Sequence, residues 1–187
     1  KNYNSNFMKG DSNIMIVEAD EYDQSFLKLD PKYSLVSSLD KDHGDIYQSY
    51  DDMLNAYKKF IHRTTHKVVG NKKLTTFSHY TYSVDSNADV FATNIYRSCN
   101  HDNTEDNMDK GSLISFVINF PNGEIINTGL YNSSYYNIEN AIGAASLAYL
   151  LGMTPSDIGS ALFTFQGVER RWEYQCWTQN LIFIDDY

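Results

Sequence analysis

The sequence has few of the residues that hold small extracellular scaffolds together. Only two cysteines occur among 187 residues, Cys99 and Cys176, and they form neither a C-x-x-C pair nor a metal-ligand spacing. This argues against a disulfide framework and a zinc site, so we interpret both as plain thiols. Three prolines and ten glycines argue against a fibrous or disordered chain.

Long hydrophobic runs and positive charge are also scarce. No run of about 18 apolar residues is present, and the polar residues 1–8 lack the apolar core of a signal peptide. We therefore expect a cytoplasmic protein without a membrane partner. The formal net charge of −9 disfavours nonspecific nucleic-acid binding, which requires a basic face. An anionic nucleotide can still bind through local amides, a metal and a few arginines.

The residues that are present predict an α/β protein of one compact unit. With 42% hydrophobic and 21% charged residues, the composition is that of a globular domain. Periodicity predicts a mostly parallel sheet flanked by helices, followed by a small antiparallel sheet. The expected strands are 14–17, 33–39, 67–69, 90–96, 113–120, 124–126 and 181–184, and the expected helices are 49–62, 137–151 and 155–162. The polar segment 98–110 is expected to be a surface loop.

Acidic residues follow the first two expected strands. The apolar run Ile14–Val17 is typical of a buried parallel strand, and Glu18-Ala19-Asp20-Glu21 comes directly after it. The strand expected at 33–39 is followed by the polar residues 40–45. Because ligands of open α/β sheets bind at the carboxyl ends of the strands, we expect a site there.

Glu18 and His43 are the candidate metal ligands at this sheet edge. Each comes after a predicted strand, and neighbouring parallel strands would bring the two together. A carboxylate oxygen and a neutral imidazole can both hold a divalent ion, and Mg²⁺ needs few protein ligands when phosphates and water complete its shell. Such an ion would neutralise charge on a transferring phosphoryl group. An acidic surface loop and a structural histidine would explain the same pattern.

Four ordered motifs span most of the chain. They are E-A-D-E-Y-D-Q-S-F-L from Glu18, D-H-G-D-I-Y from Asp42, N-I-E-N-A-I-G-A-A from Asn137, and F-Q-G-V-E-R-R-W-E-Y from Phe165 leading to I-D-D-Y at Ile184. In this order they resemble the UDP-N-acetylmuramate:L-alanine ligases within the Mur ligase family. Four motifs in order are far more specific than any one alone.

The resemblance implies the central part of a three-domain enzyme of peptidoglycan synthesis, with a fold like that of the phosphate-loop NTPases. The enzyme would use ATP and Mg²⁺ to activate the carboxylate of UDP-N-acetylmuramate as an acyl phosphate, which the amine of L-alanine attacks. Residues 1–180 would belong to the central ATP-binding domain. Residues 181–187 would begin the C-terminal domain.

The resemblance also assigns roles to individual residues. Glu18 and His43 match the magnesium ligands, and Asn140 matches the asparagine that contacts adenine. Arg171 matches an arginine near the ATP phosphates, and Asp185 lies at the hinge near the nucleotide. Taken alone, Asn140 would be an exposed polar residue of a helix, Arg171 half of a solvated arginine pair, and Asp185 a strand end.

Several positions depart from the family pattern. Tyr136 replaces a histidine next to the adenine and could still stack on a base. Ser38 replaces an asparagine, Gln24 replaces a frequent arginine, and Gly10 is not followed by the family's Gly-Lys-Thr phosphate loop. Because phosphoryl transfer depends on positioning and charge stabilisation, we expect this chain to be inactive without its own missing N- and C-terminal domains.

Two other functions remain open from the sequence. A related ligase adds a preformed murein tripeptide to UDP-N-acetylmuramate and shares the E-A-D-E-Y-D string, although the S-F-L that follows and the R-R-W-E-Y element favour the alanine enzyme. A noncatalytic module that binds a nucleotide or a partner without turnover would keep the same fold. Tyr136 and the lack of the phosphate loop are compatible with that module.

Overall fold

The structure is a computed structural model that describes residues 5, 7–39, 47–74, 76–85, 87–98, 113–131, 134–168, 170–171, 173–177 and 181–185. The chain divides into two compact units, Lys9–Tyr82 and Ser83–Tyr187 with Lys1–Met8, whereas the composition predicts one. Each unit is described by itself. The helices among the described residues are too short or too polar to cross a bilayer.

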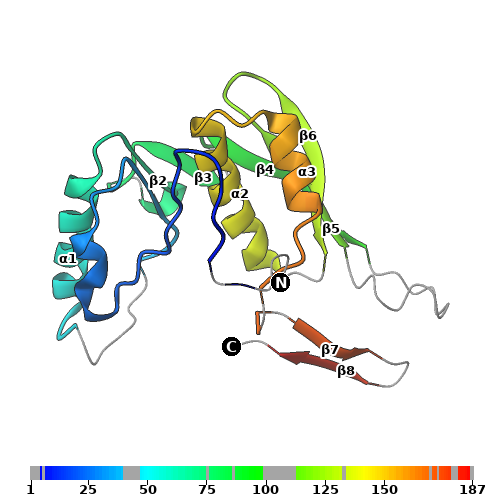
Figure 1. The fold of residues 1–187 in the computed structure, drawn as a ribbon. Helices are drawn as coiled ribbons and strands as arrows, with labels where there is room; N and C mark the ends of the chain where they lie inside the picture. Colours follow the sequence, from blue (N-terminus) through cyan, green and yellow to red (C-terminus); the bar gives the residue numbers. More distant parts are fainter. Residues whose placement is uncertain are drawn as a thin grey trace. The chain divides into compact units, whose positions relative to one another are not determined.

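The unit Lys9–Tyr82 contains the parallel strands. Its elements are η1 (Tyr22–Lys28), β1 (Tyr33–Val36), α1 (Tyr50–Arg63), β2 (Lys67–Asn71), η2 (Lys72–Leu74) and β3 (Tyr80–Ser83) (Figure 1). Strand β2 pairs in parallel with both β1 and β3. A parallel pair needs a crossover connection, and α1 provides the one between β1 and β2.

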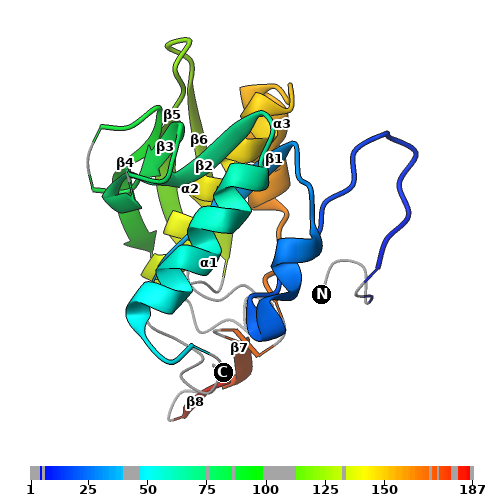
Figure 2. The ribbon, with the colours of Figure 1, turned by 90° about the vertical axis from the view of Figure 1, so that its left-hand side faces the viewer.

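Helix α1 packs on one face of this parallel sheet (Figure 2). Val36 of β1 and Val68 of β2 form a buried cluster with Leu39, against which Leu54 and Ile61 of α1 pack. The side chain of Ser49 accepts a hydrogen bond from the N–H of Asp52, and this N-cap starts the helix where the sequence predicts it. Leu54 and Ile61, which are seven positions apart, therefore lie on the same face of α1, and this face packs against the sheet.

The unit that begins at Ser83 contains antiparallel strands and two helices. Its elements are β4 (Val90–Ser98), β5 (Leu113–Asn119), β6 (Ile125–Tyr131), α2 (Tyr135–Leu150), α3 (Pro155–Phe163), β7 (Glu173–Trp177) and β8 (Ile182–Asp185). Strand β5 pairs antiparallel with β4 and β6, and β7 pairs antiparallel with β8. Within this unit the strand order is β4-β5-β6 in one sheet and β7-β8 in the other, and within the first unit it is β1-β2-β3.

Local signals explain most of these elements. Gly123 has φ +86° and its N–H donates to Phe120 O, which closes the predicted turn between β5 and β6. Thr154 caps α3 through the N–H of Asp157, with Pro155 in the first turn. Helix α2 begins two residues before the predicted start. The predicted surface loop 98–110 lies outside the described residues from position 99 onward.

The prediction of a buried strand at Ile14–Val17 is wrong. The structure gives this segment no regular secondary structure, and its four side chains are between 46% and 84% exposed. Strand formation requires a hydrogen-bonding neighbour, and none of the described strands pairs with this segment. An apolar run indicates a tendency to be buried, but the partner that would bury it is a property of the tertiary structure.

Gly129 of β6 lies where a side chain has no room. A Cβ atom there would be 2.8 Å from Ile114 O and 2.9 Å from Leu113 Cδ1. Because the carbonyl is part of the paired strand β5, we expect Gly129→Ala to lower the free energy of unfolding by about 1–3 kcal/mol. Urea denaturation would measure this. Gly10→Ala is the control, since nothing lies within 4 Å of its added Cβ, and an equal effect of both substitutions would contradict the steric explanation.

Candidate functional site

Glu18 lies on an exposed segment without regular secondary structure, four residues before the start of η1. Asp20 organises the loop that follows it: its carbonyl accepts hydrogen bonds from the N–H of Phe26 and from Ser25 Oγ, both at 3.0 Å. Its Oδ1 accepts from the N–H of Tyr22 at 2.9 Å. The acidic loop is therefore a defined turn leading into η1, with the Glu18 carboxylate open to a ligand.

Two consecutive residues of η1 have a left-handed backbone. Asp23 has φ 55° and Gln24 has φ 52°, values that cost free energy for residues with a Cβ. The N–H of Gln24 donates to Glu21 O at 3.1 Å, which helps to hold this conformation. Such strain persists only where the surroundings fix the chain, and it occurs often at functional sites.

Tyr47 joins this turn to the segment that precedes α1. Its hydroxyl donates to Glu21 O at 3.0 Å, and its ring is only 3% exposed. Burial, and secondarily the negative charge of Glu21, raises the pKa of the Tyr47 phenol above its ordinary value. The phenol is therefore neutral around pH 7 and retains the proton that it donates.

His43 lies outside the described residues, so its predicted approach to Glu18 stays a prediction. Ser38 is exposed, beyond the end of β1. Among the described residues no group of three or more His, Cys, Asp or Glu side chains could hold a metal ion. An exposed carboxylate such as Glu18 still suits Mg²⁺, a hard cation that binds oxygen and commonly takes only one or two carboxylates together with phosphates and water.

The predicted adenine contacts lie on α2, in the other unit. Tyr136 is 43% exposed and Asn140 is exposed. At a spacing of four residues they lie on the same side of the helix. The first turn of α2 carries no acidic residue, so no carboxylate there neutralises the partial positive charge at the N-terminus of the helix. This end of α2 offers an aromatic ring for stacking and an amide for hydrogen bonding.

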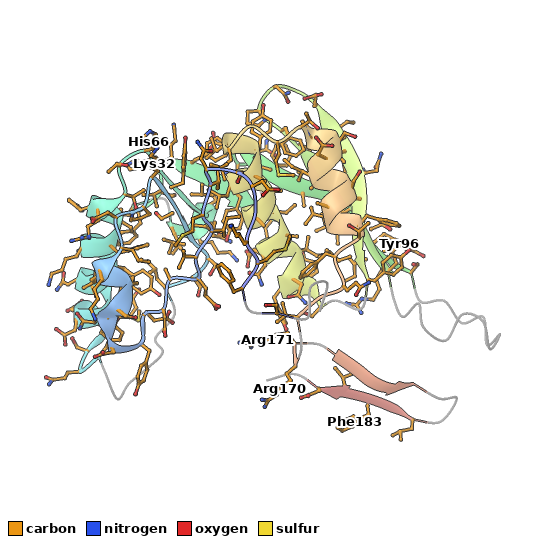
Figure 3. The ribbon with its side chains drawn as sticks, viewed as in Figure 1. Lys32, His66, Tyr96, Arg170, Arg171 and Phe183 are labelled. Atoms are coloured by element: carbon orange, nitrogen blue, oxygen red, sulfur yellow. The ribbon has the colours of Figure 1, made fainter. Side chains whose placement is uncertain are left out.

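Arg171 and Asp185 are placed by the two-stranded sheet. Figure 3 shows Arg170 and Arg171 in the segment between α3 and β7. Arg171 is exposed, two positions before Glu173, and Glu173 pairs with Asp185 in the register of β7 and β8. The fold thus brings Arg171 and Asp185 to the same end of this hairpin, although they are far apart in the sequence.

Two hollows along α1 were not predicted from the sequence. The larger, about 690 Å³, is lined by Leu27, Asn55, Lys58, Lys59, His62 and Arg63. The smaller, about 340 Å³, is lined by Gln24, Tyr47, Gln48, Asp52, Asn55, Ala56 and Lys59. Arg63 is paired with Asp30 at 2.6 Å. The basic residues near the end of α1 are the only sequence feature that points to these hollows. Basic residues at this position also stabilise a helix by interacting with its dipole, so they do not by themselves predict a binding site.

Comparison with known proteins finds relatives whose similarity extends over the whole of this chain. The chain is 34% identical over 203 aligned positions to a UDP-N-acetylmuramate--L-alanine ligase of Parabacteroides distasonis, covering 100% of this chain and 40% of that protein. It is 32% identical to the ligase of the same name of Porphyromonas gingivalis, again covering 100% of this chain and 41% of that protein. The chain belongs to the Mur ligase family.

Solved structures of the family have the same fold. The UDP-N-acetylmuramate-alanine ligase of Thermotoga maritima matches with a TM-score of 0.66 and 20% identity, over 88% of this chain and 36% of that one. MurF of Acinetobacter baumannii matches with a TM-score of 0.67 and 18% identity, over 87% of this chain and 35% of that one. No family model matches the chain. The chain spans about 40% of the length of the curated relatives that it matches.

Proposed function

We propose that the protein containing this chain is an ATP-dependent ligase that joins L-alanine to UDP-N-acetylmuramate in peptidoglycan synthesis. The observation that carries the proposal is the similarity along the entire chain to ligases of that name, at 34% identity in one relative. The matched motifs include the acidic loop, the start of α2 and the segment before β7. The fold alone does not select this substrate, since MurF matches equally well.

The proposed reaction proceeds in two steps. An oxygen of the muramate carboxylate attacks the γ-phosphorus of ATP, which forms an acyl phosphate and releases ADP. The neutral amine of L-alanine then attacks the acyl carbon, phosphate leaves with the electron pair of the broken C–O bond, and the nitrogen loses a proton to give the amide. Each step develops negative charge on phosphoryl oxygens, so positive groups near them would lower the barrier.

Each predicted site residue has a role in this proposal. Glu18 and His43 would hold a Mg²⁺ ion, which would neutralise charge on the nucleotide phosphates. Arg171 would lie near those phosphates, and Asp185 near the nucleotide. Tyr136 would stack on the adenine and Asn140 would hydrogen-bond to its edge. A member of the family, MurF of Thermotoga maritima, has been solved in complex with ADP, which supports a nucleotide as the ligand.

The domain assignment belongs to the same proposal. Residues 1–180 would form part of the central ATP-binding domain, and residues 181–187 would begin the next domain. The phosphate loop and the sites for the UDP-sugar and the amino acid would come from the parts of the full-length protein outside this chain. The chain aligns with about 40% of the length of its relative from Parabacteroides distasonis, which supports this assignment.

The test is an assay of the full-length protein with ATP, Mg²⁺, UDP-N-acetylmuramate and L-alanine. We expect ADP, phosphate and the amide product in equal amounts, and a hydroxamate when hydroxylamine replaces the amine. Product with the murein tripeptide but none with L-alanine would identify the recycling ligase instead. ATP binding without turnover of either substrate would identify a nucleotide-binding module.

Asn140 provides a test of the adenine contact. In the full-length protein we expect Asn140→Ala to weaken ATP binding about 2- to 13-fold, because a hydrogen bond contributes about 0.5–1.5 kcal/mol and a factor of ten corresponds to about 1.4 kcal/mol. Calorimetry with a nonhydrolysable ATP analogue would measure this. Binding of inorganic tripolyphosphate is the control, since it has no base, and an equal loss for both ligands would argue against an adenine contact.

A further inference from the structure

The larger hollow along α1 lies where this helix meets η1. Its lining combines Leu27 of η1 with Asn55, Lys58, Lys59 and His62 of α1. The four residues of α1 recur at intervals of three and four positions, so they share one side of the helix. Figure 2 shows η1, in blue, beside α1. A volume of about 690 Å³ is within the range of about 300–1,000 Å³ that is typical of small-molecule sites.

Positive charge gathers at this hollow in a chain whose formal net charge is −9. Lys58, Lys59 and Arg63 all line it, and within the described part of the chain neither lysine forms an ion pair. No acidic residue lies three or four positions from either lysine on the helix. Instead Arg63 follows Lys59 by four positions, a spacing at which like charges destabilise a helix. Ion pairs within α1 therefore do not neutralise this cluster.

Arg63 is held in place at the end of the hollow. Its Nε donates to Leu29 O at 2.9 Å, and its Nη2 pairs with Asp30 at 2.6 Å. Asp30 offsets this one cation, so the charges of the two lysines remain. The C-terminus of the helix opposes an anion with a partial charge of only about −0.5. Asp52, which lines the smaller hollow, precedes Lys58 by six residues, about 9 Å along the axis, where salt screens its charge.

His62 and Leu27 add a hydrogen-bonding group and an apolar surface. Nδ1 of His62 lies 3.0 Å from Lys58 O, and because a carbonyl only accepts, Nδ1 carries a proton and Nε2 is the ring nitrogen left for a ligand. Leu27 is partly buried against the cluster that contains Phe26 and Phe60, and the aliphatic stems of the lysines are apolar as well. A ligand with an anionic group and an apolar body would complement this lining.

We infer that this hollow binds a small molecule that carries a phosphoryl group on an apolar or ring-shaped body. A phosphoryl group has about −1.5 to −2 charges and three acceptor oxygens near neutral pH, which match the side chains of Lys58, Lys59 and Arg63. A carboxylate offers one charge and two oxygens. The hollow uses none of the residues proposed for ATP or Mg²⁺, so the inference does not rest on the proposed function.

Titration of the full-length protein with phenyl phosphate, followed by the NMR signals of the His62 ring, tests this site. A nonhydrolysable ATP analogue, Mg²⁺ and UDP-N-acetylmuramate are kept saturating so that they fill the proposed substrate sites. We expect a saturable shift, and binding about 10-fold weaker or more in the Lys58→Gln, Lys59→Gln double variant, because charge-assisted hydrogen bonds are lost. The matched control is Lys72→Gln, Lys73→Gln, which removes another adjacent lysine pair and should bind like wild type.

Two further comparisons test the class of ligand. Leu27→Ala should abolish the preference for phenyl phosphate over inorganic phosphate, while the affinity for inorganic phosphate stays unchanged. Glutarate, a dicarboxylate, should bind more weakly than inorganic phosphate, and equal affinity would overturn the assignment of a phosphoryl group. A shift that does not saturate, or an equal loss of affinity in both lysine double variants, would overturn the site as a whole.

Discussion

Replacing Glu18 by glutamine is expected to lower the rate of amide formation by the full-length protein about 100-fold or more. The substitution preserves the size of the side chain and removes its negative charge, so the proposed cation would lose one of its two protein ligands. A loss of about 2.7 kcal/mol of transition-state stabilisation corresponds to a factor of 100 in rate. Glu18 is exposed on a segment without regular secondary structure, so the substitution should cost little stability.

The measurement is kcat at saturating ATP over a range of Mg²⁺ concentrations. A ligand role predicts that high Mg²⁺ restores part of the rate, because a weaker site can still be filled by mass action. Glu124→Gln is the matched control, since it makes the same change at an exposed position in the turn between β5 and β6. Equal rates for Glu18→Gln and wild type at limiting Mg²⁺ would show that Glu18 is not a metal ligand.

Phe26→Ala is expected to lower the free energy of unfolding by about 3–5 kcal/mol, the usual cost of truncating a buried phenylalanine. Phe26 is 2% exposed and is the buried side chain of η1 in the cluster with Met53, Ala56 and Phe60 of α1. Its loss would leave a cavity beside Phe60 and Tyr57. Because η1 directly follows the acidic loop, the same change should also loosen the backbone at Glu21.

Chemical denaturation followed by circular dichroism would measure the stability of this variant. Phe26→Leu is the control, since it keeps most of the apolar volume and should cost clearly less than the alanine variant. Hydrogen exchange would show whether the turn at residues 20–26 opens before the rest of the unit. Alanine and leucine variants of equal stability would mean that the packing between η1 and α1 contributes little.

Local sequence signals were sufficient for the elements that are stabilised locally. The helix starts at Ser49 and Thr154 and the turn at Gly123 depend on residues within a few positions of one another. Helices α1 and α3 begin within one residue of the predicted starts, and the turn lies between the two predicted strands. The alternating burial of β5 likewise follows from its alternating apolar residues. These features need no knowledge of the rest of the fold.

Elements that depend on distant partners were not predictable in this way. The sequence analysis does not predict strand β3, Y-T-Y-S: its Tyr and Thr residues favour strands, but four residues are too short a signal, and its pairing with β2 establishes the strand. Strand β7 was likewise not predicted, and it exists through its pairing with β8. Conversely, Ile14–Val17 has the composition of a strand but no described partner.

For the candidate site, the sequence by itself determined the residue types and their order, because the motifs from Glu18 to Asp185 can be read without coordinates. Only the tertiary structure decided how the acidic loop is held: the bond from Tyr47 to Glu21 O spans 26 positions, and no local pattern encodes such a contact. The pairing of Glu173 with Asp185, which places Arg171 near the same end of the hairpin, is of the same kind. Chemistry follows from residue identity, whereas geometry follows from contacts between segments that are distant in the chain.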